Sequence, residues 1–180
     1  MVVYTKKGDT GKSSTMNGSS SKSDAVYTVL GTLDELNASL GLVHQSKKPV
    51  LIKLVFQVQS DLFTLGSWLA GSPKALEISK YFEKRTATLE REIDEIDKHN
   101  KPIRNFIIPG GTLESSYLHV SRTLARRFER QLVLYLAKNK LKGQESLLSY
   151  ANRLSDYLFV LARYYNQKGK KDLVWNLNIK

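Results

Sequence analysis

The chain has 180 residues, 41% hydrophobic and 25% charged, which suits one domain with its own core and excludes a disordered or membrane-embedded chain. The absence of cysteine excludes disulfides, thiolate catalysis and cysteine-ligated metal centres, and three scattered histidines disfavour a histidine metal cluster. The net charge of +11 favours an anionic partner, such as nucleotide, nucleic acid or membrane, without choosing among them. No apolar run reaches the roughly 20 residues that cross a bilayer, and the N-terminus lacks an apolar signal core, so we expect a cytoplasmic location.

Residues 1–24 are rich in glycine, serine, threonine and lysine, and we expect a loop there. The stretch TKKGDTGKSS at 5–14 fails the Walker pattern because only two residues separate Gly8 from Gly11. Its glycines still allow backbone N–H groups to converge on phosphate, and its hydroxyls and lysines add donors. Asp9 could order the loop or reach Mg²⁺ through water. A phosphate-binding loop and a flexible polar tail both remain open.

Apolar residues at helical spacing predict five helices, at about 24–44, 49–71, 76–96, 113–136 and 144–166. The segment NFIIPGG at 105–111 reads as a shaped turn because Pro109 and two glycines interrupt it, and no strand pattern is visible. Short connections favour antiparallel packing, hence an all-α, five-helix bundle of the ferritin-like up-down kind. We expect a single domain, with a loop at 1–24, the bundle at 25–168 and a tail at 169–180 in which Val174 and Trp175 dock.

Charged and amide side chains gather on three of these helices. Arg122, Arg126 and Glu129 follow one another at offsets of four and three, hence on one face of the fourth helix. A solvated stripe and bidentate binding of phosphate or carboxylate both fit this spacing. The first helix carries Asp34, Glu35 and Asn37, and the fifth carries Asn152, Asp156 and Arg163, for which interhelical hydrogen bonds are a sufficient alternative.

Four segments together carry a resemblance that each alone would not: YTKKGDTGKSS at 4–14, GTLDELNASLGL at 31–42, FIIPGG at 106–111 with SRTLARRFER at 121–130, and NRLSDYLFVLARY at 152–164. In this order they resemble the PduO family of ATP:cob(I)alamin adenosyltransferases, from Tyr4 to about Asn166. Residues 16–28 depart from the family pattern, carrying serine and threonine where members often have Gly-Glu-Arg and Glu. The family pattern therefore leaves the exact nucleotide contacts within residues 16–28 open.

The resemblance implies a homotrimer with each active site between adjacent subunits. It implies that the N-terminal loop wraps ATP, with candidate contacts at Thr5, Lys6, Gly8, Asp9, Gly11, Ser13 and Lys22. Arg126, Glu129 and Asn152 would complete the nucleotide site, with Glu129 as a Mg²⁺ ligand. Asp34 and Arg122 match the family's intersubunit salt bridge, and Phe106 matches the aromatic residue beneath the corrin ring, unless it is an ordinary core residue beside the turn.

The activity implied by the resemblance is transfer of the 5′-deoxyadenosyl group of ATP to cob(I)alamin, with triphosphate as leaving group. Cobalt supplies the nucleophile, which explains why no catalytic serine, cysteine or histidine is needed. A reductase and an adenosylcobalamin-dependent acceptor enzyme are implied partners, and nucleic acid and membrane are not. Two alternatives remain: a catalytically silent protein that binds nucleotide or corrinoid, and a nucleic-acid-binding protein suggested only by the net charge and the arginines of the fourth helix.

Overall fold

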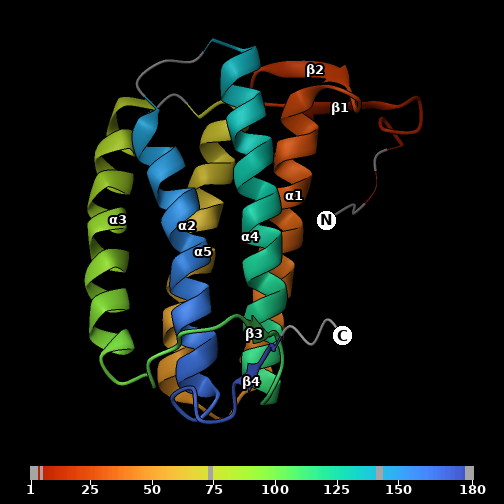
Figure 1. Cartoon of the computed structure of the whole chain (residues 1–180). Helices are drawn as coiled ribbons and strands as arrows, with labels where there is room; N and C mark the ends of the chain where they lie inside the picture. Colours follow the sequence, from red (N-terminus) through yellow and green to blue (C-terminus); the bar gives the residue numbers. More distant parts are fainter. Residues whose placement is uncertain (1–3, 5, 73–74, 141–143, 177–180) are drawn as a thin grey trace.

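The computed structural model describes residues 4, 6–72, 75–140 and 144–176, apart from the side chains of residues 75–77. Its five long helices alternate in direction as an up-down bundle (Figure 1), which confirms the expected fold class. They are α1 (Ala25–Gly41), α2 (Pro49–Leu69), α3 (Ala75–Asp97), α4 (Leu113–Lys138) and α5 (Glu145–Tyr165), with a short 3₁₀ turn, η1 (Leu42–Gln45), after α1. All five lie within a few residues of their predicted positions.

Two helix starts show why these boundaries were readable from the sequence. Pro49 is the first residue of α2, where its fixed φ suits a helix and its missing N–H costs no hydrogen bond. Thr112 caps α4, because its hydroxyl accepts a hydrogen bond from the backbone N–H of Ser115 at 3.2 Å.

The expectation that the chain has no strands is wrong, since two small antiparallel sheets occur. β1 (Lys12–Thr15) and β2 (Gly18–Ser21) form a hairpin inside the segment predicted as loop, and β3 (Ile107–Ile108) pairs with β4 (Leu173–Val174). The hairpin strands are mostly serine and threonine, so no alternation of apolar and polar residues marks them. Each strand of the second sheet has two residues, which is too short for a periodic pattern.

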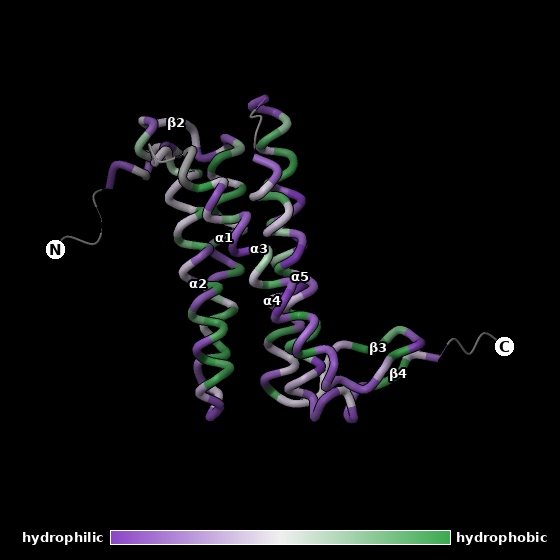
Figure 2. The backbone as a smooth tube through the Cα atoms, turned by 90° about the vertical axis from the view of Figure 1, so that its left-hand side faces the viewer, coloured by the Kyte–Doolittle hydropathy of each residue, from purple (hydrophilic) through white to green (hydrophobic). Residues whose placement is uncertain are grey.

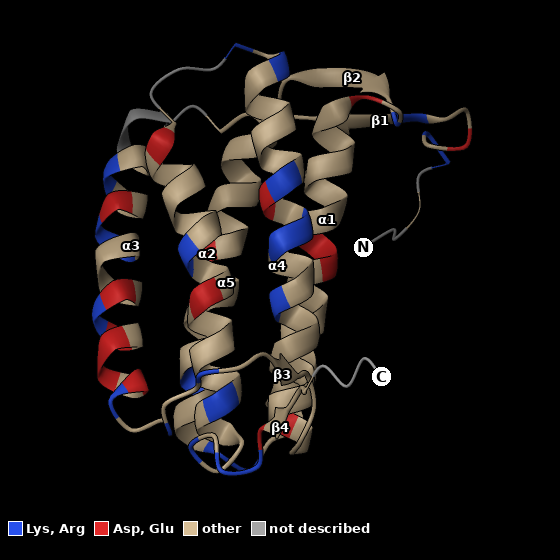
Figure 3. Cartoon of the chain, viewed as in Figure 1, with Lys and Arg blue, Asp and Glu red and all other residues tan. Residues whose placement is uncertain are grey.

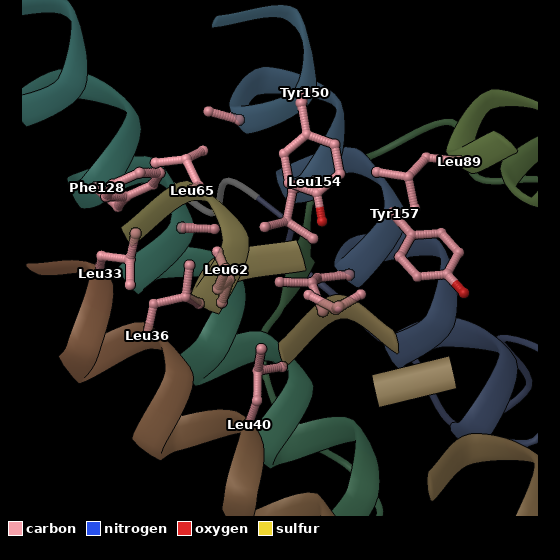
Figure 4. Close-up of a cluster of buried hydrophobic side chains, with 14 of the residues drawn as sticks. Leu33, Leu36, Leu40, Leu62, Leu65, Leu89, Phe128, Tyr150, Leu154 and Tyr157 are labelled. Atoms are coloured by element: carbon pink, nitrogen blue, oxygen red, sulfur yellow. The ribbon is translucent and has the colours of Figure 1, made fainter. Parts of the chain in front are cut away.

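Leucines from all parts of the bundle fill the core, joined by a few aromatic rings (Figure 4). Leu36 and Leu40 of α1 are fully buried, as are Leu62 of α2, Phe128 of α4 and Leu154 of α5. Burying each such side chain contributes about 1.5–3 kcal/mol. Along every helix hydrophilic and hydrophobic stretches alternate (Figure 2), as expected for helices that bury one stripe. In the described part of the chain, no helix is long and apolar enough to span a membrane.

A buried carboxylate joins three helices inside this core. Asp61 of α2 is fully buried and accepts hydrogen bonds from the Arg85 guanidinium at 2.8 Å, the Tyr81 hydroxyl at 2.6 Å and the Tyr150 hydroxyl at 2.8 Å. Burial, and then the hydrogen bond to Asp61, raise the pKa of Tyr81 to about 12. Burial also raises the pKa of Tyr150, so both phenols stay protonated donors at neutral pH.

The two small sheets lie at opposite ends of the bundle (Figures 1 and 2). The β1–β2 hairpin covers the end where α1 begins and α4 finishes, whereas β3 and β4 project from the end where α4 begins and α5 finishes. The second sheet docks the C-terminal segment, because the Trp175 N–H donates to the Phe106 carbonyl at 2.8 Å. The expected docking of Val174 and Trp175 is thereby confirmed.

Candidate active site

A cavity of about 880 Å³ opens at the end of the bundle that carries β3 and β4. Its walls come from three directions: the loop that precedes α4, the first turns of α4 and the last turns of α5 with the C-terminal segment. Residues from these walls include Ile103, Phe106, His119, Arg122, Phe159 and Trp175. The volume lies in the upper part of the range for small-molecule sites, and aromatic rings alternate with cationic groups around it.

Phe106 stands out in this cavity because 81% of its side chain is exposed. The alternative that it is an ordinary core phenylalanine is therefore wrong. A large aromatic ring gains nothing from contact with water, so its position on the cavity wall suits contact with an apolar ligand surface. The backbone of Phe106 is fixed from the other side by the hydrogen bond to Trp175.

Arg122 lines the same cavity from α4. Its Nε lies 3.4 Å from Nδ1 of His119, a buried residue whose pKa is lowered to about 4, first by burial and then by the charge of Arg122. His119 is thus neutral at pH 7 and able to accept this hydrogen bond. Burial, and then the charge of Arg126, lower the pKa of Arg122 itself. The two arginines therefore lie close enough to form one positive region beside the cavity.

Asp34 does not pair with Arg122 within one chain. It is exposed on α1, and none of the ion pairs among the described residues joins the two. The contact across α1 and α4 is made instead by Glu35 and Arg127, where basic residues of α4 lie beside acidic residues of α1 (Figure 3). One chain thus leaves the predicted pair of Asp34 and Arg122 apart.

The other helical candidates meet on the surface between α4 and α5. The Asn152 amide donates to the Glu129 carboxylate at 2.8 Å, and exposed Arg126 lies one turn before Glu129 on α4. The offset of three along α4 places Arg126 and Glu129 on one face, and the hydrogen bond across to α5 adds the Asn152 amide to Glu129. Such a group can bind phosphate oxygens through its cation and a hydrated divalent ion through its carboxylate.

The candidates of the N-terminal segment belong to a hydrogen-bonded loop and hairpin. The ammonium group of Lys22 donates to the Gly8 carbonyl at 3.0 Å, its backbone N–H donates to the Gly11 carbonyl at 2.8 Å, and the Tyr27 hydroxyl donates to the carbonyl of Ser13. Gly11 has a φ of +75°, a conformation that favours glycine. Exposed Lys6 and Asp9 belong to the same loop, and Thr5 lies outside the described residues.

The N-terminal loop and Phe106 do not come together in one chain. The hairpin contacts the C-terminal end of α4, where it shares a polar pocket of about 370 Å³ with Tyr135 and Lys138. Phe106 instead shares its cavity with His119 and Arg122 in the N-terminal half of α4, toward the end where β3 and β4 lie (Figure 1). A helix of 26 residues is roughly 39 Å long at about 1.5 Å per residue. A single site that uses both regions therefore needs more than one copy of the chain.

Sequence reasoning missed several cavity residues. His119 looked like one of three scattered histidines, and Phe159 falls at a spacing that suits the core of α5 as well as its cavity wall. Trp175 was expected only as part of a docked tail. The spacing of these residues does not show that α5 and the C-terminal segment close the cavity against α4. That information lies in the tertiary structure alone.

Comparison with known proteins shows which family has this sequence and fold. A family described as cobalamin adenosyltransferase matches residues 3–165. The corrinoid adenosyltransferase of Bacillus subtilis is 35% identical over 173 residues, which cover 93% of this chain and 88% of the relative. The corrinoid adenosyltransferase PduO of Citrobacter freundii is 39% identical over 167 residues, 91% of this chain but 49% of that protein.

A solved structure shows the same architecture. A variant of the PduO-type ATP:corrinoid adenosyltransferase from Lactobacillus reuteri, complexed with cobalamin and ATP, superposes with a TM-score of 0.86 at 32% identity, covering 99% of this chain and 98% of that one. The fold and the cavity define a helical-bundle protein with an open cavity at one end. The chain belongs to the cobalamin adenosyltransferase family, because the family match spans nearly all of the bundle.

Proposed function

We propose that this protein transfers the 5′-deoxyadenosyl group of ATP to the cobalt of a reduced corrinoid, giving adenosylcobalamin and triphosphate. The observation that carries the proposal is the cavity of about 880 Å³ with the exposed ring of Phe106 on its wall and the arginines of α4 beside it, in a chain of this family. A flat macrocycle needs an open, partly apolar wall of this kind, and a triphosphate needs the adjacent cations.

The reaction is a nucleophilic displacement at the 5′ carbon of ATP. The electron pair of cob(I)alamin forms the cobalt–carbon bond, the carbon–oxygen bond to the triphosphate breaks, and its electron pair leaves with that oxygen. The protein's own groups position the two substrates and compensate negative charge on the leaving triphosphate. Arg126 is the candidate for this charge compensation, since it is exposed and lies one turn before Glu129 on α4.

Mg²⁺ would accompany the triphosphate rather than occupy a cage of protein ligands. Among the described residues no three His, Cys, Asp or Glu side chains converge on one point. Glu129 offers a single carboxylate, one of whose oxygens is held by Asn152 at 2.8 Å. This donor set fits Mg²⁺, which commonly binds one or two carboxylates while phosphates and water fill its other positions.

Phe106 would act on the corrinoid rather than on ATP. Cob(II)alamin is hard to reduce while a lower axial ligand donates to cobalt, and an aromatic ring at the lower face displaces that ligand. The support for this role is the position of the ring, which is 81% exposed on the cavity wall. The electrons would come from a separate reductase, and the product would pass to an adenosylcobalamin-dependent enzyme. We propose that all of them share the cytoplasm.

A homotrimer would complete the site. The N-terminal loop and Phe106 lie at opposite ends of one chain, so the loop of one subunit would serve the cavity side of the next. Asp34 and Arg122, unpaired with each other in one chain, are the candidates for a salt bridge across that interface. Exposed apolar side chains on α4, such as Val120 and Leu134, supply surface for such a contact.

The test is an anaerobic assay with purified protein, chemically reduced cob(I)alamin, Mg²⁺ and ATP, in which the corrinoid spectrum follows formation of the cobalt–carbon bond. We expect adenosylcobalamin with the wild-type protein and a loss on the order of 100-fold in Arg126→Ala, because a charge-stabilising donor is removed from the leaving group. Measurable ATP binding without any turnover would instead identify a silent binding protein.

A further inference from the structure

The C-terminal strand directly determines where Phe106 lies. Ile107 and Ile108 pair with Val174 and Leu173, and the Phe106 carbonyl accepts from the Trp175 N–H at 2.8 Å. A pair of two-residue strands is too short to be stable alone. Whatever fixes β4 therefore also fixes Phe106 and Trp175, which line the same cavity.

Asp172 immediately precedes β4, and its carboxylate is held on both oxygens. One oxygen accepts from Nε of Arg163 at 2.7 Å, and the other accepts from the Asn166 amide at 2.8 Å. The side chains of Arg163 and Asp172 are each only 3% exposed. A buried ion pair of this kind is costly to break, because a charge away from water loses its closest compensation. Without Asp172, Arg163 keeps only a longer ion pair, 3.6 Å, to the exposed carboxylate of Asp97.

The same cluster also fixes both ends of the loop that carries Phe106. Near its start, the Arg163 guanidinium donates to the Lys101 carbonyl. Near its end, the Thr112 N–H donates to the Asn166 side-chain oxygen at 3.2 Å, just before α4 begins. The Arg163 guanidinium further lies 6.0 Å from the ring centroid of Phe159, which belongs to the cavity wall.

The backbone between α5 and Asp172 is shaped to bring the pair together. Gln167, Lys168 and Gly169 have φ values of 58°, 57° and 76°, three successive residues in the left-handed region. A Cβ on Gly169 would lie 2.8 Å from the Arg163 guanidinium and 3.0 Å from the Asp172 carboxylate. Only glycine allows this close approach, and the two non-glycine residues store strain that the ion pair must hold in place.

We propose that the buried pair of Arg163 and Asp172 is a latch that positions Phe106 and Trp175 on the cavity wall. Neither residue of the latch is needed to touch a substrate, so both are positioning residues. The structural half of the proposal concerns where the C-terminal segment lies. The catalytic half, that the latch sets the efficiency of corrinoid reduction through Phe106, rests on the proposed function.

The structural half is tested by the fluorescence of Trp175. The chain has two tryptophans, so Trp68→Phe leaves Trp175 as the sole reporter. In this background we expect Asp172→Asn to increase quenching by acrylamide, because Trp175 undocks with β4. Asp61→Asn is the matched control, since it breaks another buried pair, with Arg85 between α2 and α3. Among the described residues, none of that pair's hydrogen bonds involves the loop, so quenching should be unchanged. Gly169→Ala, which crowds the pair, replaces Asp172→Asn if that variant does not fold.

The catalytic half is tested by comparing two forms of the corrinoid. For Asp172→Asn we expect turnover with cob(II)alamin and a reductant to fall on the order of 100-fold, because a small displacement of a positioning group has such an effect, while KM for ATP is unchanged. The loss with pre-reduced cob(I)alamin should be smaller, since Phe106 acts before reduction. An equal loss with both corrinoids, or a parallel rise in KM for ATP, would overturn the catalytic half.

Failure of the latch and failure of the proposed function give different results. If Asp172→Asn leaves Trp175 quenching as in the parent, no latch exists, whatever the turnover. If quenching increases while turnover with cob(II)alamin is unchanged, the segment is latched but does not position Phe106. If the wild-type protein forms no adenosylcobalamin from cob(I)alamin, the proposed function fails, and the quenching comparison still decides the structural half.

Discussion

At the scale of single residues, the proposed chemistry uses a side chain that contributes little to folding. Phe106 and Phe128 make the contrast plain, because the first ring is 81% exposed and the second is fully buried. The Phe106 ring therefore contributes little to the free energy of folding. We expect its favourable contacts to be with a ligand, so that a mutation can change ligand binding without changing stability.

We expect Phe106→Ala to leave the midpoint of thermal unfolding unchanged and to lower reductive adenosylation of cob(II)alamin on the order of 100-fold, because the ring proposed to displace the axial ligand is lost. Affinity for ATP should not change. Phe128→Ala is the matched control and should cost about 3–5 kcal/mol of unfolding free energy, as a core cavity does. Destabilisation by Phe106→Ala comparable to that control would contradict a role in ligand contact.

At the scale of elements, α3 is attached to the bundle partly through one charge. Asp61 of α2 binds Arg85 and Tyr81 of α3 and Tyr150 of α5, and all three bonds are 2.8 Å or shorter. Asp61→Asn should lower the free energy of unfolding by about 3–5 kcal/mol, because Arg85 keeps its charge in a largely buried position without a compensating anion. Urea denaturation measures this loss.

A surface pair at the C-terminal end of α3 is the control for this prediction. Glu95 and Lys98 form an ion pair with both side chains about two-thirds exposed. Glu95→Gln should leave the urea midpoint unchanged, because water solvates both groups once the pair is broken. Equal sensitivity of the two carboxylates would mean that the Asp61 network does not attach α3.

The same scale shows what the sequence could and could not predict. Apolar periodicity and Pro49 located the helices, because these signals are local. The offset from Arg126 to Glu129 likewise placed two site residues on one face. Asp156 and Arg163 were grouped with Asn152, yet Asp156 pairs with Arg153 on the surface at 2.7 Å and Arg163 is buried against Asp172. The pairing of Arg163 with Asp172 depends on how the chain turns back after α5, and the spacing of apolar residues does not predict such a turn.

At the scale of the whole molecule, one chain keeps the two groups of proposed site residues apart. The ATP-loop candidates lie by the hairpin and the corrinoid-side residues lie by β3 and β4, at opposite ends of the bundle (Figure 1). A closed ring of identical subunits resolves this, because each interface would pair one end of a chain with the other end of its neighbour. Light scattering should then give three times the chain mass of 20.4 kDa.

The salt bridge proposed across that interface is testable by exchanging its charges. Asp34→Arg and Arg122→Asp should each weaken the assembly or its turnover, because each places like charges in contact, and the double variant should recover part of the loss. Mixing the two single variants should also restore turnover, since the basic group introduced in one variant can meet the acidic group introduced in the other only between subunits. Glu35→Gln is the control, because it breaks a pair with Arg127 inside one chain; it should weaken neither the assembly nor its turnover. Recovery in the double variant without recovery on mixing would mean that Asp34 and Arg122 meet within one chain, and the site would then need no neighbour.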